Sequence, residues 1–273
     1  MGHGIAIVAA QAGYRVCLYD IADDLLQDAK QKIERFTEKS VEKGKITVEE
    51  RQAMLGRIRY QTELEQVEAD LAIEAAPENI GIKQELFEYF EEKYNGEVIL
   101  ATNTSSIPIT KVAAGLKYPQ KVVGMHFFNP APIMKLVEVI SGVETEPEVA
   151  QVISQLAEKM GKSPSIVSDT PGFIVNRVAR YYYLESLKIL EENVAGHEQI
   201  DALMESTGFR MGPFKLMDLI GVDTNHDVTQ SIYSAFFNEP RFRPSRIQEK
   251  KVQAGHHGRK RGQGFYTYGE KKT

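Results

Sequence analysis

Cysteine and tryptophan are the scarcest residues of this chain: Cys17 is the single cysteine, and there is no tryptophan. One cysteine excludes an intrachain disulfide and a cysteine-rich zinc site, and so few cysteines are typical of a reducing compartment. No apolar run approaches the roughly 20 residues of a membrane helix, and no basic stretch precedes the apolar run Ile5–Ala10, as it would in a signal peptide. We therefore expect a cytoplasmic protein that binds no membrane and carries no metal.

An excess of positive charge is also missing. The chain has 33 lysine and arginine residues against 38 aspartate and glutamate residues, which gives a formal net charge of −5. This balance argues against a nucleic acid or an anionic membrane as the main partner. The 42% hydrophobic and 26% charged residues are ordinary for a globular protein, and 273 residues are enough for one or two domains.

Short apolar segments alternate with helix-like segments through the first two thirds of the chain. Strands are predicted over residues 14–19, 71–76, 97–101, 122–128, 136–140 and 165–167. Helices are predicted over residues 5–12, 82–94, 110–115 and 149–160. Such alternation predicts an α/β fold with a mostly parallel sheet and helices on both of its faces.

A long charged stretch, residues 23–57, interrupts this alternation. Its apolar residues recur at helical spacing until Gly44, and Thr47 with Glu50 forms a capping-box pattern that opens a second helix. The stretch therefore predicts a helical hairpin that projects from the α/β domain. The hairpin is rich in lysine, which suits an anionic phosphate tail; the alternative is a solvated helix face. These lysines are Lys30, Lys32, Lys39, Lys43 and Lys45.

The pattern changes after Asp169. Helices are predicted over residues 173–194, 200–206, 213–220 and 228–237, and strand-like residues return only at 264–266. The turn-forming residues of the segment 169–172 (DTPG) are placed as a linker requires. We therefore expect two domains, an α/β domain over residues 1–168 and an all-helical domain over residues 169–273.

The first twenty residues carry a weak signal for a dinucleotide. Gly2 and Gly4 open a predicted helix, a strand follows, and that strand ends in Asp20. In dinucleotide-binding units the glycines admit the pyrophosphate at a helix N-terminus, and an acidic residue about 20 positions later binds the ribose hydroxyls. Asp20 would repel a 2′-phosphate, which favours NAD over NADP. The alternative is a flexible terminus followed by a turn residue.

Two polar residues stand in strands that are otherwise apolar. His126 ends the segment VVGMH, and Glu138 lies inside LVEVI, where an unpaired carboxylate is rarely found. The prolines between the two segments allow the chain to turn back, so a hairpin brings His126 and Glu138 together. A carboxylate on one ring nitrogen fixes the tautomer and stabilises the imidazolium, as a general base acting on a hydroxyl requires. The alternatives are a core histidine and a structural ion pair.

Two polar groups can complete a site. The cluster TNTSS, which contains Asn103 and Ser105, follows a strand at the carboxyl edge of the predicted sheet, where ligands bind in such folds. Asn176 lies in the first turn of the long helix that opens the second domain. Amides and hydroxyls at these places suit hydrogen bonds to a cofactor or to a substrate carbonyl. Loop caps and helix-start residues are the alternatives.

Five segments together resemble the L-3-hydroxyacyl-CoA dehydrogenase family, most of all its short bacterial members, the 3-hydroxybutyryl-CoA dehydrogenases. The segments are GMHFFNPAPIMKLVEVI, ATNTSSIPIT, DTPGFIVNR, MGPFKLMDLIGVD and GRKRGQGFYTY. The resemblance covers nearly the whole chain. It implies a Rossmann-like NAD domain with the helical hairpin, a helical C-terminal domain that forms a homodimer and contributes to substrate binding, and an acyl-CoA substrate. The implied reaction reversibly oxidises a short L-3-hydroxyacyl-CoA, such as 3-hydroxybutyryl-CoA, to a 3-ketoacyl-CoA.

The resemblance also implies a role for individual residues. It makes His126 the general base and Glu138 its partner, with Ser105 and Asn176 holding the substrate near its 3-hydroxyl and thioester carbonyl. Substrate contacts are further implied for Asn129 and Lys43. The residues expected at the cofactor are Gly2, Asp20, Glu78, Lys83, Asn103, Ser105, Asn129 and Lys260.

Two other functions stay open on the same residues. Relatives that oxidise small sugar acids or hydroxy acids use a similar histidine–glutamate pair without coenzyme A. A non-catalytic dimeric scaffold is the other, because Gly2 aligns with the last glycine of the family's nucleotide turn. The strand and the two glycines before it, roughly ten residues, are therefore not in this sequence. We expect that the protein begins upstream of Met1.

Overall fold

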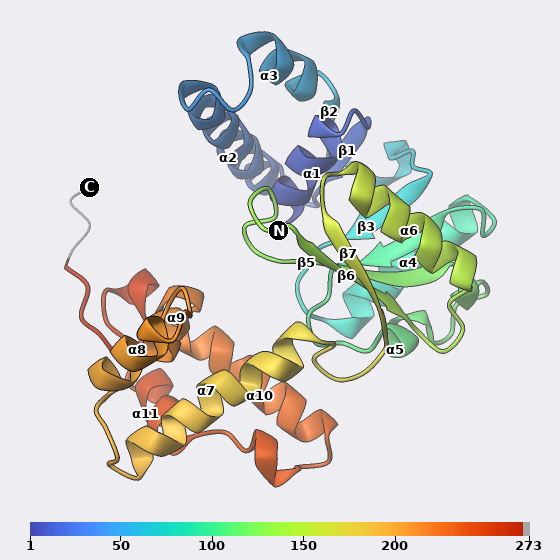
Figure 1. The fold of residues 1–273 in the computed structure, drawn as a ribbon. Coiled ribbons are helices and arrows are strands. Elements are labelled where there is room, and N and C mark those ends of the chain that lie inside the picture. The colour runs from blue at the N-terminus through green and yellow to red at the C-terminus, as the bar shows by residue number, and fades with distance from the viewer. Residues whose placement is uncertain (270–273) are drawn as a thin grey trace. The chain divides into compact units, whose positions relative to one another are not determined.

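The computed structural model describes residues 1–269. It divides the chain into two compact units, one of residues 1–169 and one that begins at Thr170 (Figure 1). No helix of the described residues is both long enough and apolar enough to cross a bilayer.

The first unit contains two hydrogen-bonded sheets. The smaller sheet pairs β1 (Val16–Tyr19) with β2 (Ile58–Gln61) in parallel. The larger sheet has the order β3 (Leu71–Glu74), β4 (Ile99–Thr102), β5 (Val122–Phe127), β6 (Leu136–Ser141), β7 (Ser163–Ser168). Its strands are parallel except for the antiparallel pair β5–β6. The predicted mostly parallel sheet is confirmed, whereas β2 was not predicted from the sequence.

The helices of the first unit are α1 (Gly2–Gln11), α2 (Asp23–Glu42), α3 (Val48–Leu55), α4 (Ile80–Lys93), α5 (Ile109–Ala113) and α6 (Pro147–Lys159). The helical hairpin consists of α2 and α3. The Thr47 hydroxyl accepts the Glu50 N–H, and the Glu50 carboxylate accepts the Thr47 N–H. This reciprocal cap satisfies two of the amides that a helix start leaves without partners.

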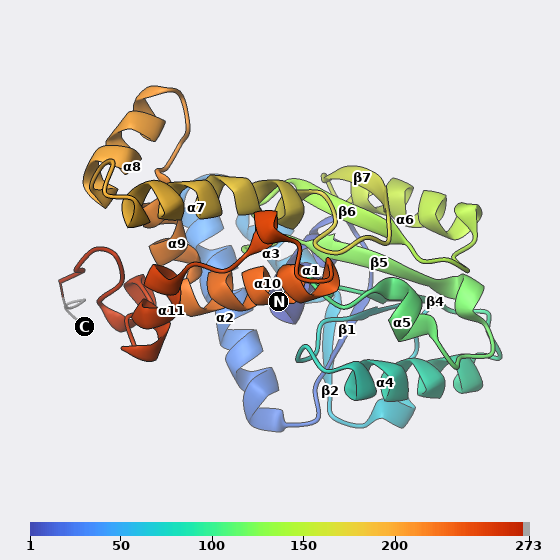
Figure 2. The same cartoon turned by 90° about the horizontal axis from the view of Figure 1, so that it is seen from below.

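Helices cover both faces of the larger sheet (Figure 2). Val123 and Met125 of β5 pack with Ile153 of α6 in one core cluster. Gly124 points to the opposite face, since side chains alternate along a strand. A Cβ atom there would lie 2.8 Å from the Ile109 side chain of α5, so glycine lets α5 approach this face. Strand β5 is thereby held between two layers of helices.

Helix α1 is buried along most of its length and joins two cores. Its residues Ile5 and Val8 belong to the core of the larger sheet. Its residues Ala6, Ile7 and Ala10 belong to a second cluster with the hairpin helices and β2. The smaller sheet and the hairpin therefore share with α1 a hydrophobic core that is distinct from the core under the larger sheet.

The second unit is helical, as predicted. Its helices are α7 (Val175–Glu191), α8 (His197–Ser206), α9 (Pro213–Ile220), α10 (Val222–Ala235) and α11 (Arg246–Gln253). Leu187, Phe214 and Phe265 are buried in its core. The enclosed Asp218 carboxylate accepts the N–H groups of Phe265 and Tyr266, which fastens the C-terminal segment to α9. Helix α11 was not predicted.

Candidate active site

The β5–β6 hairpin brings His126 and Glu138 together. The two residues are opposite each other in the antiparallel register, and Nδ1 of His126 lies 2.8 Å from Oε2 of Glu138. Both are buried, at 5% and 1% exposure. The His126 ring also lies 4.5 Å from the Phe128 ring, centroid to centroid. With Nδ1 facing a carboxylate, the ring is held in one orientation, and proton exchange with a ligand is directed to Nε2.

Asn103 connects the loop after β4 to the same hairpin. Its side-chain oxygen accepts the Phe127 N–H at 2.8 Å, one residue after His126. Its own N–H donates to the Glu74 carbonyl at 2.8 Å. Asn103 therefore fixes the carboxyl end of β5 against that of β4 and β3. This is the edge at which open α/β sheets bind their ligands.

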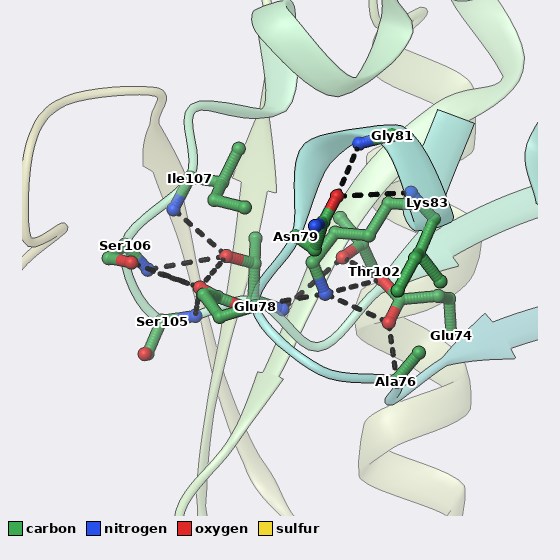
Figure 3. A network of polar contacts seen from close by, with 12 residues as sticks. Glu74, Ala76, Glu78, Asn79, Gly81, Lys83, Thr102, Ser105, Ser106 and Ile107 are labelled. Carbon is green, nitrogen blue, oxygen red and sulfur yellow. Dashed lines mark hydrogen bonds and ion pairs between the residues drawn. The ribbon is translucent and has the colours of Figure 1, made fainter. Parts of the chain in front are cut away.

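A charged network lies beside this loop (Figure 3). The Lys83 ammonium, 1% exposed, lies 2.8 Å from Oε1 of Glu74 and 3.3 Å from Oε2 of Glu78. Glu74 is itself buried and also accepts hydrogen bonds from the Thr102 hydroxyl at 2.6 Å and the Ala76 N–H at 2.6 Å. Lys83 is enclosed between these two carboxylates and holds Glu78 in place.

Glu78 orders the loop that carries Ser105. Its Oε1 accepts the N–H groups of Ser105 and Ser106 at 3.2 Å each, as well as the Thr104 hydroxyl. Burial raises the pKa of the Glu78 carboxyl, but the hydrogen bonds from Thr104 and Ser106 and the charge of Lys83 outweigh it and leave this pKa below its ordinary value. Figure 3 shows the Ser105 hydroxyl on the side away from Glu78.

A pocket of about 390 Å³ lies between the start of α1, helix α2 and the segment after β5. Its lining includes Gly4 and Asn129, so both residues border the same pocket. A Cβ atom on Gly4 would lie 3.3 Å from Ala131 and from Pro132, which shows how closely α1 approaches this segment. The cationic residues of the lining are His3, Lys32, Arg35 and Lys39, of which His3 is a cation only when protonated.

The residues present suit a dinucleotide. Gly2 is the first residue of α1, and Asp20 directly follows β1. The Asp20 N–H donates to the Gln61 carbonyl at 3.3 Å, while its carboxylate makes no hydrogen bond or ion pair to the described residues. That carboxylate can accept hydrogen bonds from ribose hydroxyls. Residues 2, 20, 78, 103 and 129 thus all belong to the first unit.

Three further predicted residues lie on the hairpin or in the second unit. Lys43 is exposed at the C-terminal cap of α2 and does not line the pocket. Asn176 is the second residue of α7, and Lys260 donates to Asp223 at 2.7 Å; both belong to the second unit. No group of three or more histidine, cysteine, aspartate or glutamate side chains within residues 1–269 is arranged to hold a metal ion.

Sequence reasoning missed two residues of the first unit. Glu74 is a carboxylate in the otherwise apolar strand LAIEAA. The same pattern identified Glu138 and could have identified Glu74. Arg35 lies on α2 three residues after Lys32 and four before Lys39, a spacing that places all three on one helix face. Arg35 was missed because only the lysines of the hairpin were considered as cations.

Fold and site define an NAD-binding α/β unit joined to a helical unit. Residues 1–170 match the family model of the 3-hydroxyacyl-CoA dehydrogenase NAD binding domain, and residues 172–268 match the model of the C-terminal domain of the same enzymes. The chain therefore belongs to the 3-hydroxyacyl-CoA dehydrogenase family.

Curated relatives agree with this assignment. The 3-hydroxyadipyl-CoA dehydrogenase of Escherichia coli is 47% identical over 98% of this chain, which spans 57% of that protein. A probable 3-hydroxybutyryl-CoA dehydrogenase of Deinococcus radiodurans is 42% identical over 98% of this chain and 96% of its own. The crystal structure of an E. coli 3-hydroxybutyryl-CoA dehydrogenase matches the whole chain with a TM-score of 0.96 and 46% identity, and 58% of that structure is covered.

Proposed function

We propose that the protein catalyses the reversible, NAD-dependent oxidation of a short-chain L-3-hydroxyacyl-CoA, with 3-hydroxybutyryl-CoA as substrate, to the 3-ketoacyl-CoA. The observation that carries this proposal is the buried pair of His126 and Glu138, whose 2.8 Å contact is built into the β5–β6 register. The family, and the names of the relatives from D. radiodurans and of the E. coli crystal structure, support the same activity.

In this reaction His126 is the general base. Its Nε2 takes the proton of the 3-hydroxyl, while the C3–H bond breaks with both electrons leaving as hydride and the C3–O bond becomes a carbonyl. NAD, when bound, accepts that hydride. In the reverse direction the imidazolium returns its proton to the keto oxygen. Glu138 orients the ring and stabilises its charged form, and base catalysis of this kind contributes roughly 10²–10⁴-fold.

Other residues bind and orient. We assign Gly2, Asp20, Glu78, Asn103 and Lys260 to the cofactor, and Ser105 and Asn129 to both cofactor and substrate. Asn176 holds the substrate, and the coenzyme A phosphates are attracted by Lys43 and by the pocket cations. Lys83 contributes through Glu78, because its ammonium is enclosed between two carboxylates.

We propose further that the domain of residues 1–168 carries the cofactor and that the domain from residue 169 provides the contact of a cytoplasmic homodimer. Large apolar side chains exposed on the second unit support that contact: Val178, Val194, Leu203 and Phe237 are 64%, 69%, 64% and 95% exposed. Sedimentation equilibrium should give twice the chain mass. A monomer at micromolar concentration would remove the dimer from the proposal.

The activity is tested by steady-state kinetics with NADH and acetoacetyl-CoA. Free 3-hydroxybutyrate and small sugar acids with NAD serve as comparison substrates. Turnover of the thioester, with little turnover of the free acids, supports the proposal. Turnover of a free acid alone would make the protein a hydroxy-acid dehydrogenase. The absence of both turnover and NADH binding, measured by cofactor fluorescence, would make it a scaffold; the absence of tryptophan keeps that signal free of tryptophan fluorescence.

A further inference from the structure

Arg180 of α7 is a buried cation without a carboxylate partner. It is 3% exposed, and within residues 1–269 no carboxylate lies at ion-pair distance from its guanidinium. Its hydrogen bonds go to neutral acceptors: Nε to the Asn176 carbonyl at 3.1 Å, and Nη1 to the Asn225 carbonyl at 2.9 Å and the Thr229 hydroxyl at 2.7 Å. Buried charges are ordinarily paired, so an isolated one needs an explanation.

The surroundings of Arg180 do not supply the missing negative charge. Its Cζ lies 4.9 Å from the centre of the Tyr183 ring, and burial raises the pKa of that phenol, which therefore stays neutral. Burial also lowers the pKa of Arg180 to about 10, which leaves the guanidinium charged at neutral pH. Stacking occupies a face of the guanidinium and leaves its edge for an anion.

The polar groups around Arg180 are incompletely satisfied. Asn225, whose carbonyl accepts from Arg180, has an enclosed side-chain nitrogen with no acceptor among the described residues. The nearby Gln248 leaves one enclosed oxygen without a donor, but this acceptor is neutral and does not balance the charge. Nη2 of Arg180 makes no hydrogen bond to the described residues, and unlike the Asn225 nitrogen it is not fully enclosed. It is the donor that remains for a ligand.

Arg180 lies one helical turn after Asn176. Residues four apart share a helix face and are separated by about 6 Å along the axis. On the proposed function Asn176 holds the substrate near its 3-hydroxyl and thioester carbonyl. A few methylene groups beyond C3 therefore span the distance from Asn176 to the guanidinium.

We infer that Arg180 binds a terminal carboxylate on the acyl chain, so that the preferred substrates are 3-hydroxyacyl-CoA thioesters of dicarboxylic acids. This inference rests on the proposed dehydrogenase activity and replaces the neutral acyl chain of 3-hydroxybutyryl-CoA, as the preferred substrate, by one that ends in a carboxylate. The carboxylate would supply the acceptor and the negative charge that the cluster of Arg180 and Asn225 lacks. Arginine suits this task because its fork pairs with a carboxylate through two parallel hydrogen bonds.

The test compares two six-carbon substrates with NAD: 3-hydroxyhexanoyl-CoA and the same thioester with a terminal carboxylate. The wild-type protein should show the higher kcat/KM for the carboxylate substrate. In Arg180→Gln this value should fall roughly 10- to 100-fold, as for the loss of a charged hydrogen bond, with much less change for the neutral substrate. Arg180→Lys should restore part of the preference. Lys188→Gln, which removes an exposed cation of the same helix, should keep it.

The outcomes distinguish a failure of the carboxylate site from a failure of the proposed dehydrogenase activity. Equal kcat/KM for both substrates in the wild-type protein would overturn the carboxylate site and leave the dehydrogenase intact, even if no Arg180 variant folds. Equal losses for both substrates in Arg180→Gln would reduce Arg180 to a support for Asn176. Turnover of neither thioester would overturn the proposed function, and the carboxylate site with it.

Discussion

The ammonium of Lys83 lies 2.8 Å from one carboxylate oxygen of Glu74 and 2.9 Å from the other, and both side chains are almost completely buried. Helix α4 and strand β3 are thus joined by a fully desolvated ion pair. Such a pair is costly to form and costlier to break, because removal of one partner leaves the other charge buried and uncompensated.

Lys83→Met should therefore destabilise the first unit by about 3–5 kcal/mol. Urea unfolding monitored by circular dichroism measures this change. Lys117→Met breaks an exposed pair with Glu92 and serves as the control, with an expected loss of about 0–1 kcal/mol. The double variant Glu74→Gln/Lys83→Met should recover part of the loss. Equal small effects of both lysine variants would show that burial does not govern this pair.

His126→Gln should lower turnover by roughly 10²–10⁴-fold, because the base that takes the hydroxyl proton is gone. The affinity for NADH, measured by cofactor fluorescence, should change little. His256→Gln is the control, because the side chain of this second-unit histidine makes no hydrogen bond to the described residues. Near-full activity of His126→Gln would rule out this residue as the base.

Binding of the coenzyme A moiety should depend on the cationic side chains of the pocket. Arg35→Gln should raise the KM for acetoacetyl-CoA roughly two- to fivefold, as expected for one exposed charge contact, with kcat nearly unchanged. The effect should shrink as the salt concentration rises. Lys30→Gln changes a cation of the same helix that lies near the Tyr60 ring and outside the pocket, and its KM should stay at the wild-type value. Equal responses of the two variants would contradict a role for the pocket.

Glu78 should make stability depend on acidity. Its pKa is held below the ordinary value, so the stabilisation is fully present above the unfolded pKa of about 4.3 and is lost as the pH falls through the lower, folded value. In urea unfolding, the difference between wild-type protein and Glu78→Gln should therefore be largest near pH 7 and shrink towards pH 3. Glu88→Gln, on the exposed face of α4, should show no such trend. A difference that grows in acid would reverse the assigned direction.

Local patterns predicted the features that depend on neighbours in sequence. The capping box of Thr47 and Glu50 and the carboxylate of Glu138 in an apolar strand were both visible as patterns and are present in the structure. The strand β2 was missed because its four residues, IRYQ, begin soon after helix α3 ends and have too few alternations to be distinguished from a loop.

The remaining features depend on contacts between distant segments. Lys83 and Glu74 are a pair only because α4 packs beside β3, and sequence spacing gives no sign that the lysine is enclosed. The isolation of Arg180 likewise arises from its packing against α10, which supplies carbonyl and hydroxyl oxygens but no carboxylate. Patterns within one segment predict its secondary structure, whereas the charge balance of a site follows from the tertiary fold.

The position of α1 between two hydrophobic cores has a consequence for local unfolding. The smaller sheet and the hairpin share the core that contains Ile7, and the larger sheet shares the core that contains Val8. Helix α1 therefore contributes buried side chains to both groups at once, and the two cores meet along its length. Amide hydrogen exchange should therefore find α1 at least as strongly protected as β1 and β5, because its opening exposes both cores.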